Sequence, residues 1–196
     1  MQEKLNVAVI IGSTRAGRFS EKPAHWIMGE LQKHSDINAE LLDLRDYPLP
    51  LFNEPISPSS RKELYTEEPM AAWQKKIGAA DAFIIVSPEY NHGYSAATKN
   101  ALDYLSGEWH RKPVAFISYG TVGGARAVEQ LRQVVIDLRM APLAAAIHML
   151  GEPLAALKAA QSPVDSMLFA PYAEKAEKLI AEILWWGNAL KAARTK

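Results

Sequence analysis

The sequence contains no cysteine and no apolar run long enough to span a bilayer, and its charges balance. The absence of cysteine excludes disulfides, thiolate metal ligands and thiol catalysis. A membrane-spanning helix needs about 20 consecutive apolar residues, and no stretch approaches that length. The formal net charge is +0, which gives no broad attraction for nucleic acid or an anionic membrane surface. We therefore expect neither kind of partner, and any redox chemistry must come from a bound cofactor.

Metal-binding and targeting patterns are also missing. The histidines show neither an HxH nor an HExxH spacing, so the sequence predicts no metal site. The N-terminal segment has an early acid and only a short apolar run before Gly12, which is typical of a first strand and not of a signal peptide. We expect a cytoplasmic protein whose 196 residues (1–196) form a single domain with a sizeable core.

Strand and helix patterns alternate along the chain. Short apolar runs predict strands at residues 5–11, 39–44, 81–87, 113–119 and 142–147. Amphipathic spacing predicts helices at residues 20–33, 69–80, 95–105, 123–140 and 171–194. Four prolines make residues 46–60 a loop, and residues 150–167 look irregular. This alternation predicts an α/β fold with a doubly wound parallel sheet.

Ligands of such sheets bind beyond the carboxyl ends of the strands, where the strand order reverses. In the order 2-1-3-4-5 the first, third and fourth strands are neighbours, and unusual loops follow all three. These are the first loop (residues 12–20), the second loop (residues 88–94) and the third loop (residues 120–124). We therefore expect the three loops to form one binding site.

The first loop, GSTRAGRFS, has the composition of a phosphate-binding segment. Gly12 permits a sharp turn, and hydroxyl and guanidinium groups follow at the start of a helix, where backbone amides favour an anion. The loop is not an NTP-binding P-loop, because Arg18 and Phe19 replace the required Lys and Ser/Thr. The alternative is a polar turn with solvated arginines.

The second and third loops suit a flat ring. Tyr90 or Tyr94 offers a stacking surface, while Asn91 and loop amides can hydrogen-bond the ring edge. His92 is expected to be a bystander. The GTVGG sequence of the third loop allows close approach of amides to a planar ligand, although a tight turn before a helix would account for its glycines equally well.

A serine hydrolase is a further alternative. Residues 93–97, GYSAA, resemble a nucleophile elbow around Ser95, and Asp137 and His148 follow in the order that a triad requires. However, five residues separate the predicted strand from Gly93, whereas an elbow directly follows its strand. Ser95 is therefore better explained as the N-cap of the next helix.

With these segments in view, the chain resembles the NAD(P)H-dependent FMN reductase family of flavodoxin-like proteins. The resemblance covers about the first 145 residues and rests on GSTRAGRFS (12–20), DLRDYPLPLF (43–52), SPEYNHGYSAATKNALDYL (87–105), EW..KP (108–113) and SYGTVGGARA (118–127). It implies a flavodoxin-like five-stranded sheet of order 2-1-3-4-5 with helices on both faces.

The resemblance also implies a cofactor and its site. FMN would be bound non-covalently, with its phosphate held by Ser13, Arg15, Arg18 and Ser20. The isoalloxazine would lie against Pro88, Glu89, Tyr90 and Asn91, with Ser118, Tyr119, Gly120 and Gly123 nearby. Hydride would pass from NADPH or NADH to FMN, and electrons then to a small-molecule acceptor: free flavin, a quinone, an azo compound or a metal oxyanion. No side-chain nucleophile is assigned, because the cofactor carries the chemistry. Relatives of this kind are commonly homodimers or homotetramers.

Two other functions remain at this stage: a non-enzymatic flavodoxin-like electron carrier and the hydrolase built on Ser95. Such a carrier would usually be acidic, which the balanced charge disfavours. The sequence does not choose among acceptors or between NADPH and NADH. The alanine-rich segment from Arg139 onward carries no functional motif.

Overall fold

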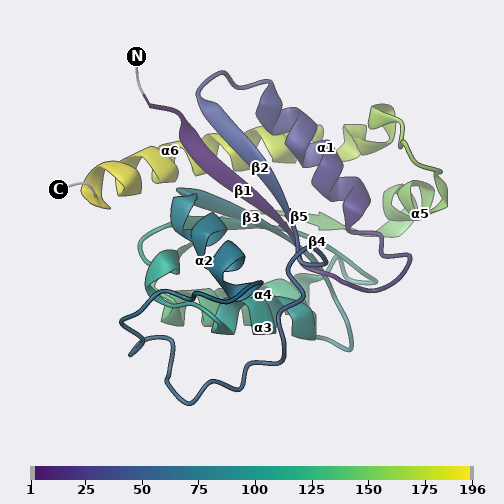
Figure 1. Cartoon of the computed structure of the whole chain (residues 1–196). Helices are drawn as coiled ribbons and strands as arrows, with labels where there is room; N and C mark the ends of the chain where they lie inside the picture. Colours follow the sequence, from purple (N-terminus) through teal and green to yellow (C-terminus); the bar gives the residue numbers. More distant parts are fainter. Residues whose placement is uncertain (1–2, 195–196) are drawn as a thin grey trace.

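The computed structural model describes residues 3–194 and contains one parallel sheet. Its strands are β1 (Leu5–Ile11), β2 (Ile37–Asp43), β3 (Ala82–Pro88), β4 (Pro113–Tyr119) and β5 (Ala141–Met149). They are arranged in the order β2-β1-β3-β4-β5, and every neighbouring pair is parallel (Figure 1). The predicted fold class and strand order are confirmed.

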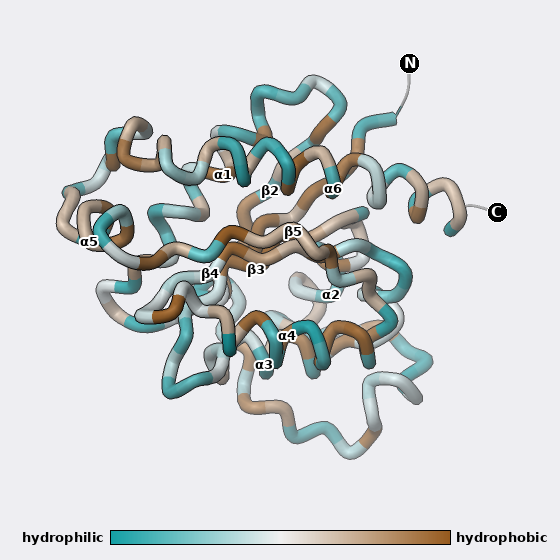
Figure 2. Tube along the Cα trace, turned by 180° about the vertical axis from the view of Figure 1, so that it is seen from behind, coloured by the Kyte–Doolittle hydropathy of each residue, from teal (hydrophilic) through white to brown (hydrophobic). Residues whose placement is uncertain are grey.

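Helices cover both faces of the sheet (Figure 2). One layer holds α1 (Glu21–Gln32) and α6 (Ala173–Arg194), and the other holds α2 (Met70–Ala79), α3 (Ala96–Asp103) and α4 (Ala125–Asp137). Two short 3₁₀ helices, η1 (Gly107–Trp109) and η2 (Ser166–Tyr172), lie between the larger elements. Because both faces are covered, β3 and β4 are buried at every position, which explains their continuous apolar sequences.

The expectation of irregular structure at residues 150–167 is wrong for its first half, where α5 (Gly151–Ala159) forms. Gly151 has a φ of 65°, a left-handed conformation suited to the turn that precedes the helix. Pro153 lies in the first turn, where its missing amide hydrogen is tolerated, and Leu154 and Leu157 bury the inner face. Only these two leucines face the core, so the apolar periodicity was too weak to reveal the helix.

No helix within residues 3–194 combines the length and the apolar character needed to cross a bilayer.

At the end of β1, the turn requires a residue without a side chain. A Cβ on Gly12 would lie 2.6 Å from Thr98 Oγ1 and 2.9 Å from the Val86 carbonyl oxygen. The Gly12 carbonyl in turn accepts hydrogen bonds from the hydroxyls of Ser95 (2.5 Å) and Thr98 (2.9 Å). The start of α3 therefore fixes the point at which the first loop leaves the sheet.

Gly12→Ala should lower the free energy of unfolding by about 2 kcal/mol, within the range for overpacking a rigid site. The matched control is Gly29→Ala in α1, where a Cβ would meet nothing within 4 Å. That substitution should raise the free energy of unfolding by up to about 1 kcal/mol through helix propensity. Urea unfolding of both variants tests this pair, and equal stabilities would contradict the close contact at Gly12.

Candidate functional site

The three loops meet at the carboxyl ends of β1, β3 and β4 and surround a cavity of about 260 Å³. The residues that line it come from the three loops, from the end of β4 and from α5: Arg15, Arg18, Phe19, Glu89, Tyr90, Tyr119, Gly120, Thr121 and Lys158. The topology thus brings together the segments that the sequence singled out.

The first loop is fixed by Arg18, whose side chain is only 1% exposed. Its guanidinium forms a two-pronged ion pair with Asp43 at the end of β2, contacts Glu21 Oε1 at 2.9 Å and donates to the Ser13 carbonyl at 2.5 Å. Burial alone would raise the pKa of the Asp43 carboxyl, but hydrogen bonding to Arg18 outweighs it and holds this pKa below its ordinary value. Arg18 is therefore engaged with the protein itself.

Of the other predicted phosphate ligands of this loop, Arg15 lines the cavity, whereas Ser13 and Ser20 are fully buried. Ser13 Oγ lies 2.8 Å from the Tyr90 hydroxyl and so joins the first loop to the second. The Arg15 guanidinium lies 6.0 Å from the centre of the Tyr90 ring. It forms no ion pair with any carboxylate of residues 3–194. Its charge is therefore available to a ligand.

The second loop is a tight hairpin. Tyr90 and Gly93 exchange two backbone hydrogen bonds of 2.8 and 3.0 Å. Asn91 and His92 have φ values of 49° and 71°, as in a type I′ turn, and occupy its tip. Pro88 is buried as the last residue of β3, so Asn91 is the most exposed of the predicted ring contacts here.

Glu89 connects this hairpin to the start of α4. Its carboxylate accepts hydrogen bonds from Arg126 Nε (2.8 Å) and from the Arg126 backbone amide (3.1 Å). Burial would raise the pKa of Glu89, but the Arg126 guanidinium reverses this and lowers it. Glu89 therefore remains ionised, and its charge is neutralised by Arg126.

The third loop is fixed by a buried side chain at the end of β4. The Ser118 hydroxyl is fully buried, donates to the Gly123 carbonyl at 2.7 Å and lies 2.9 Å from His148 Nδ1. Gly124 has a φ of 74°, and a Cβ there would lie 2.6 Å from Ser118 Cβ. Ser118 and Gly123 thus shape the loop that presents Gly120 to the cavity.

Three buried hydroxyls have no hydrogen-bond partner in the described part of the chain, those of Ser20, Tyr119 and Tyr172, and the first two lie at the start of α1 and at the end of β4. Ser20 is the fully buried N-cap of α1, yet its side chain does not cap the helix. Burial raises the pKa of Tyr119 to about 12, so its hydroxyl stays protonated. The two groups are close enough to influence each other, but they form no hydrogen bond of normal geometry. Buried hydroxyls without a partner are uncommon, which makes these two groups candidates for contact with a polar ligand.

The charges that line the cavity leave a positive excess. Arg18 and Glu89 are neutralised by their partners, whereas neither Arg15 nor Lys158 pairs with a carboxylate in residues 3–194. A phosphate monoester carries about −1.5 to −2 charges at neutral pH. It would match the two cations Arg15 and Lys158, together with the N-terminus of α1 and the Ser20 hydroxyl that has no partner. The site therefore fits the phosphate of FMN.

Sequence reasoning did not find Phe19, Thr121 or Lys158 as cavity residues. Phe19 packs edge-on against Tyr119 with ring centres 4.8 Å apart. Lys158 comes from the end of α5, which Lys22 Nζ holds by donating to the carbonyls of Leu157 (2.8 Å) and Ala160 (2.6 Å). Because these contacts join residues 135 and 138 positions apart, no local pattern could have revealed Lys158.

The geometry does not support a hydrolase. Ser95 is the N-cap of α3, as expected, and accepts from the Thr98 amide at 3.1 Å while donating to Gly12. His148 contacts Ser118 and the Gly123 carbonyl instead of Ser95. No group of three or more potential metal ligands occurs in residues 3–194.

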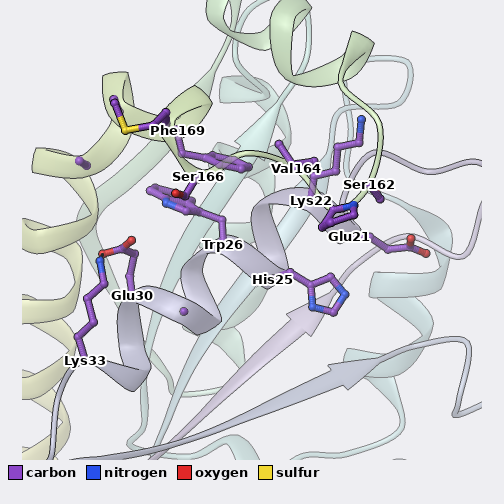
Figure 3. Close-up of a pocket in the computed structure, with 15 residues that line it drawn as sticks. Glu21, Lys22, His25, Trp26, Glu30, Lys33, Ser162, Val164, Ser166 and Phe169 are labelled. Carbon is purple, nitrogen blue, oxygen red and sulfur yellow. Dashed lines mark hydrogen bonds and ion pairs between the residues drawn. The ribbon is translucent and has the colours of Figure 1, made fainter.

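A larger cavity, of about 750 Å³, lies elsewhere, between α1 and residues 162–173 (Figure 3). Its floor contains Trp26 and Phe169, whose rings stack with centres 4.7 Å apart and planes inclined by 4°. It is lined by no residue of the second or third loop and by neither Ser20 nor Tyr119. Size alone therefore does not identify the cofactor site.

Comparison with known proteins gives one consistent result. The family model described as NADPH-dependent FMN reductase matches residues 5–153. The chain is 41% identical over 146 residues to an NAD(P)H-dependent FMN reductase of Schizosaccharomyces pombe, covering 73% of this chain and 72% of that protein. It is 33% identical over 144 residues to a quinone reductase of Escherichia coli K12, covering 70% and 73%.

Solved structures agree on the fold. An NADH:FMN oxidoreductase in its apo form matches with a TM-score of 0.65 at 16% identity, covering 89% of this chain and 88% of that one. A flavoenzyme NAD(P)H:(acceptor) oxidoreductase from Paracoccus denitrificans matches with a TM-score of 0.57 at 22% identity, covering 95% and 94%.

Asp43→Asn should lower the free energy of unfolding at pH 7 by about 3 kcal/mol, because it leaves the buried Arg18 guanidinium with only Glu21 as a counter-ion. The native pKa of Asp43 is depressed, so its contribution is complete above the unfolded-state pKa of about 3.9 and disappears as the pH falls through the native value. Urea unfolding at pH 7 and at lower pH should therefore show the variant and the parent converging below about pH 4. A constant difference across this range would be inconsistent with the pairing.

Ser20→Ala should leave the stability of the FMN-free protein unchanged or slightly raised, because the hydroxyl has no partner to lose. The same change should weaken FMN binding by about 1 kcal/mol. Ser95→Ala is the contrasting control: it removes the α3 N-cap and should lower stability by about 1–2 kcal/mol. Thermal unfolding and flavin-fluorescence titration distinguish the two variants, and a destabilised Ser20→Ala protein would argue against a ligand role.

Proposed function

The chain belongs to the NADPH-dependent FMN reductase family, and from this premise we propose that it uses NAD(P)H to reduce a quinone through FMN bound in the cavity between the three loops. The observation that supports this most is that the buried hydroxyls of Ser20 and Tyr119 have no hydrogen-bond partner within residues 3–194. Two cations without counter-ions there, Arg15 and Lys158, line the same cavity as Tyr119. Bound FMN would supply the hydride and electron transfer between NAD(P)H and the acceptor. The protein itself would position the cofactor, orient its ring and shield it from water.

The phosphate would be held by Ser13, Arg15 and Ser20 with the amides at the start of α1. Arg18, expected from the resemblance to contact the phosphate, has its guanidinium committed to Asp43, Glu21 and the Ser13 carbonyl. We assign it the role of a positioning residue that sets the shape of the first loop. Arg15 then supplies the charge that reaches the phosphate.

The ring would lie against the second loop, with Pro88, Glu89, Tyr90 and Asn91, and Tyr119 and Gly120 of the adjoining segment would lie beside it. The Glu89–Arg126 ion pair fixes the second loop to α4, and the Ser118–Gly123 hydrogen bond fixes the third loop to the end of β4. A binding surface that is already ordered lowers the entropic cost of binding a flat ring. Backbone amides of these loops would stabilise negative charge on the pyrimidine edge of the ring.

Relatives named FMN reductase and quinone reductase suggest planar acceptors for this chain. Aromatic side chains at the cavity, Phe19, Tyr90 and Tyr119, favour a flat molecule over a compact metal oxyanion. A homodimer or homotetramer, a single domain over residues 1–196 and a cytoplasmic location stay predictions.

The acceptor is tested by NADPH oxidation with excess FMN and, in parallel, a naphthoquinone, an azo dye or chromate. The proposal predicts the highest kcat/KM with the quinone. A faster reaction with the dye or chromate would replace the quinone by that acceptor. Bound flavin with no turnover for any acceptor would instead indicate a flavodoxin-like electron carrier.

Arg15→Ala should weaken FMN binding by about 1–3 kcal/mol, the range for a charge-assisted hydrogen bond. Arg132→Ala, on α4 and outside the cavity, is the matched control and should bind FMN as the parent does. Fluorescence titration with FMN measures both dissociation constants. Unchanged affinity in the Arg15 variant would remove this residue from the phosphate site.

A further inference from the structure

A second cavity, of about 330 Å³, has only basic side chains around it. It is lined by Gly107, His110, Arg111, Arg139 and Arg194. No carboxylate is among these residues, although the whole chain has equal numbers of acidic and basic groups, 22 of each. The charge at this place is therefore a local excess.

Three separate segments contribute the arginines. Arg111 lies between η1 and β4, Arg139 between α4 and β5, and Arg194 is the last residue of α6. The Arg111 amide donates to the Arg139 carbonyl at 2.8 Å, and Arg194 Nη1 donates to the Arg111 carbonyl at 2.7 Å. Its lining residues precede β4 and β5 and end α6, so the cavity lies at the end of the sheet opposite to the three loops. Figure 1 shows where α6 ends relative to the sheet.

Most of this charge has no counter-ion. Arg194 Nη2 contacts Asp81 at 2.9 Å, and Lys191 shares the same carboxylate. Neither Arg111 nor Arg139 forms an ion pair within residues 3–194, and both side chains are exposed. Two guanidinium groups can thus turn toward a ligand, and the third is already held at the cavity wall.

Neighbouring groups respond to this positive field. Burial lowers the pKa of His110, and Arg139 and Arg111 lower it further. Burial lowers the pKa of Lys112 to about 8, with Arg194 adding to the effect. Lys112, the residue after Arg111, does not line the cavity, and its Nζ donates to the carbonyls of Ile77 (2.8 Å) and Gly78 (3.1 Å). An anion bound here would relieve the mutual repulsion of these cations.

We propose that this basic cavity binds a small, multiply charged phosphorylated ligand, with Arg111 and Arg139 gripping its phosphate oxygens and Arg194 closing the third side. The planar fork of arginine matches phosphate oxygens two at a time, and two or more negative charges are needed to balance the excess. The volume accommodates a diphosphate group. Such a ligand would tie the end of α6 to the turns before β4 and β5.

Inorganic pyrophosphate is the probe, added at constant ionic strength to the ¹⁵N-labelled, FMN-saturated protein. The backbone amides of Arg111 and Met140 and the arginine Nε–H groups should shift in a saturable way, separately from any shifts in residues 12–20. Orthophosphate should bind more weakly, because it carries less charge. These shifts do not depend on flavin reduction, so failure here and failure of the reductase proposal are distinguishable.

The variant Arg111→Gln/Arg139→Gln keeps polar side chains but removes both charges, and it should raise the dissociation constant at least about tenfold, because each lost charged hydrogen bond is worth about that factor. Lys62→Gln/Lys175→Gln changes the net charge equally on exposed lysines and should bind pyrophosphate as the parent does. FMN affinity should be the same in both variants, which verifies their folding. Non-saturable shifts, or equal loss in both variants, would overturn the proposal.

Discussion

The buried ion pair between Arg18 and Asp43 determines how the rest of the site is arranged. It ties the first loop, at the end of β1, to the end of β2, and through the Ser13 carbonyl it fixes the residue that meets Tyr90 of the second loop. Burying a guanidinium is unfavourable unless its donors are satisfied, and here Asp43, Glu21 and a carbonyl satisfy them. The loop therefore has one shape before any ligand arrives.

A division of labour follows among the polar groups around the cavity. Arg18, Glu89, Ser118 and Ser95 have their hydrogen bonds completed by the protein and hold the walls. The hydroxyls of Ser20 and Tyr119 lack a hydrogen-bond partner, and Arg15 and Lys158 lack a counter-ion within residues 3–194, so we propose these four groups for ligand binding. Arg15, Arg18 and Ser20 come from the same short loop, so the composition of a loop does not reveal which role each residue has. The same principle distinguishes Arg111 and Arg139 from the paired Arg194 at the far end of the sheet.

The sequence predicted the sheet well, because buried parallel strands such as β3 and β4 read as unbroken apolar runs and their loops must share one edge. It located the three loops but did not separate the residues that build them from those that bind. The partner of Arg18 is 25 residues away, and Glu89 meets Arg126 37 residues on. Such contacts depend on tertiary structure, as does the arrival of Lys158 from α5. The sequence did not predict α5 because only Leu154 and Leu157 are buried on its inner face, which gives too weak an apolar periodicity.

The most direct measurement is an absorption spectrum of the protein after it has been loaded with FMN and desalted, followed by anaerobic addition of NADPH. We predict that flavin absorbance is retained and then bleached by NADPH. Retained flavin that neither NADPH nor NADH bleaches would contradict a reductase. If desalting removes the flavin, NADPH oxidation with excess FMN is the deciding readout, and its absence would contradict an FMN site between these loops.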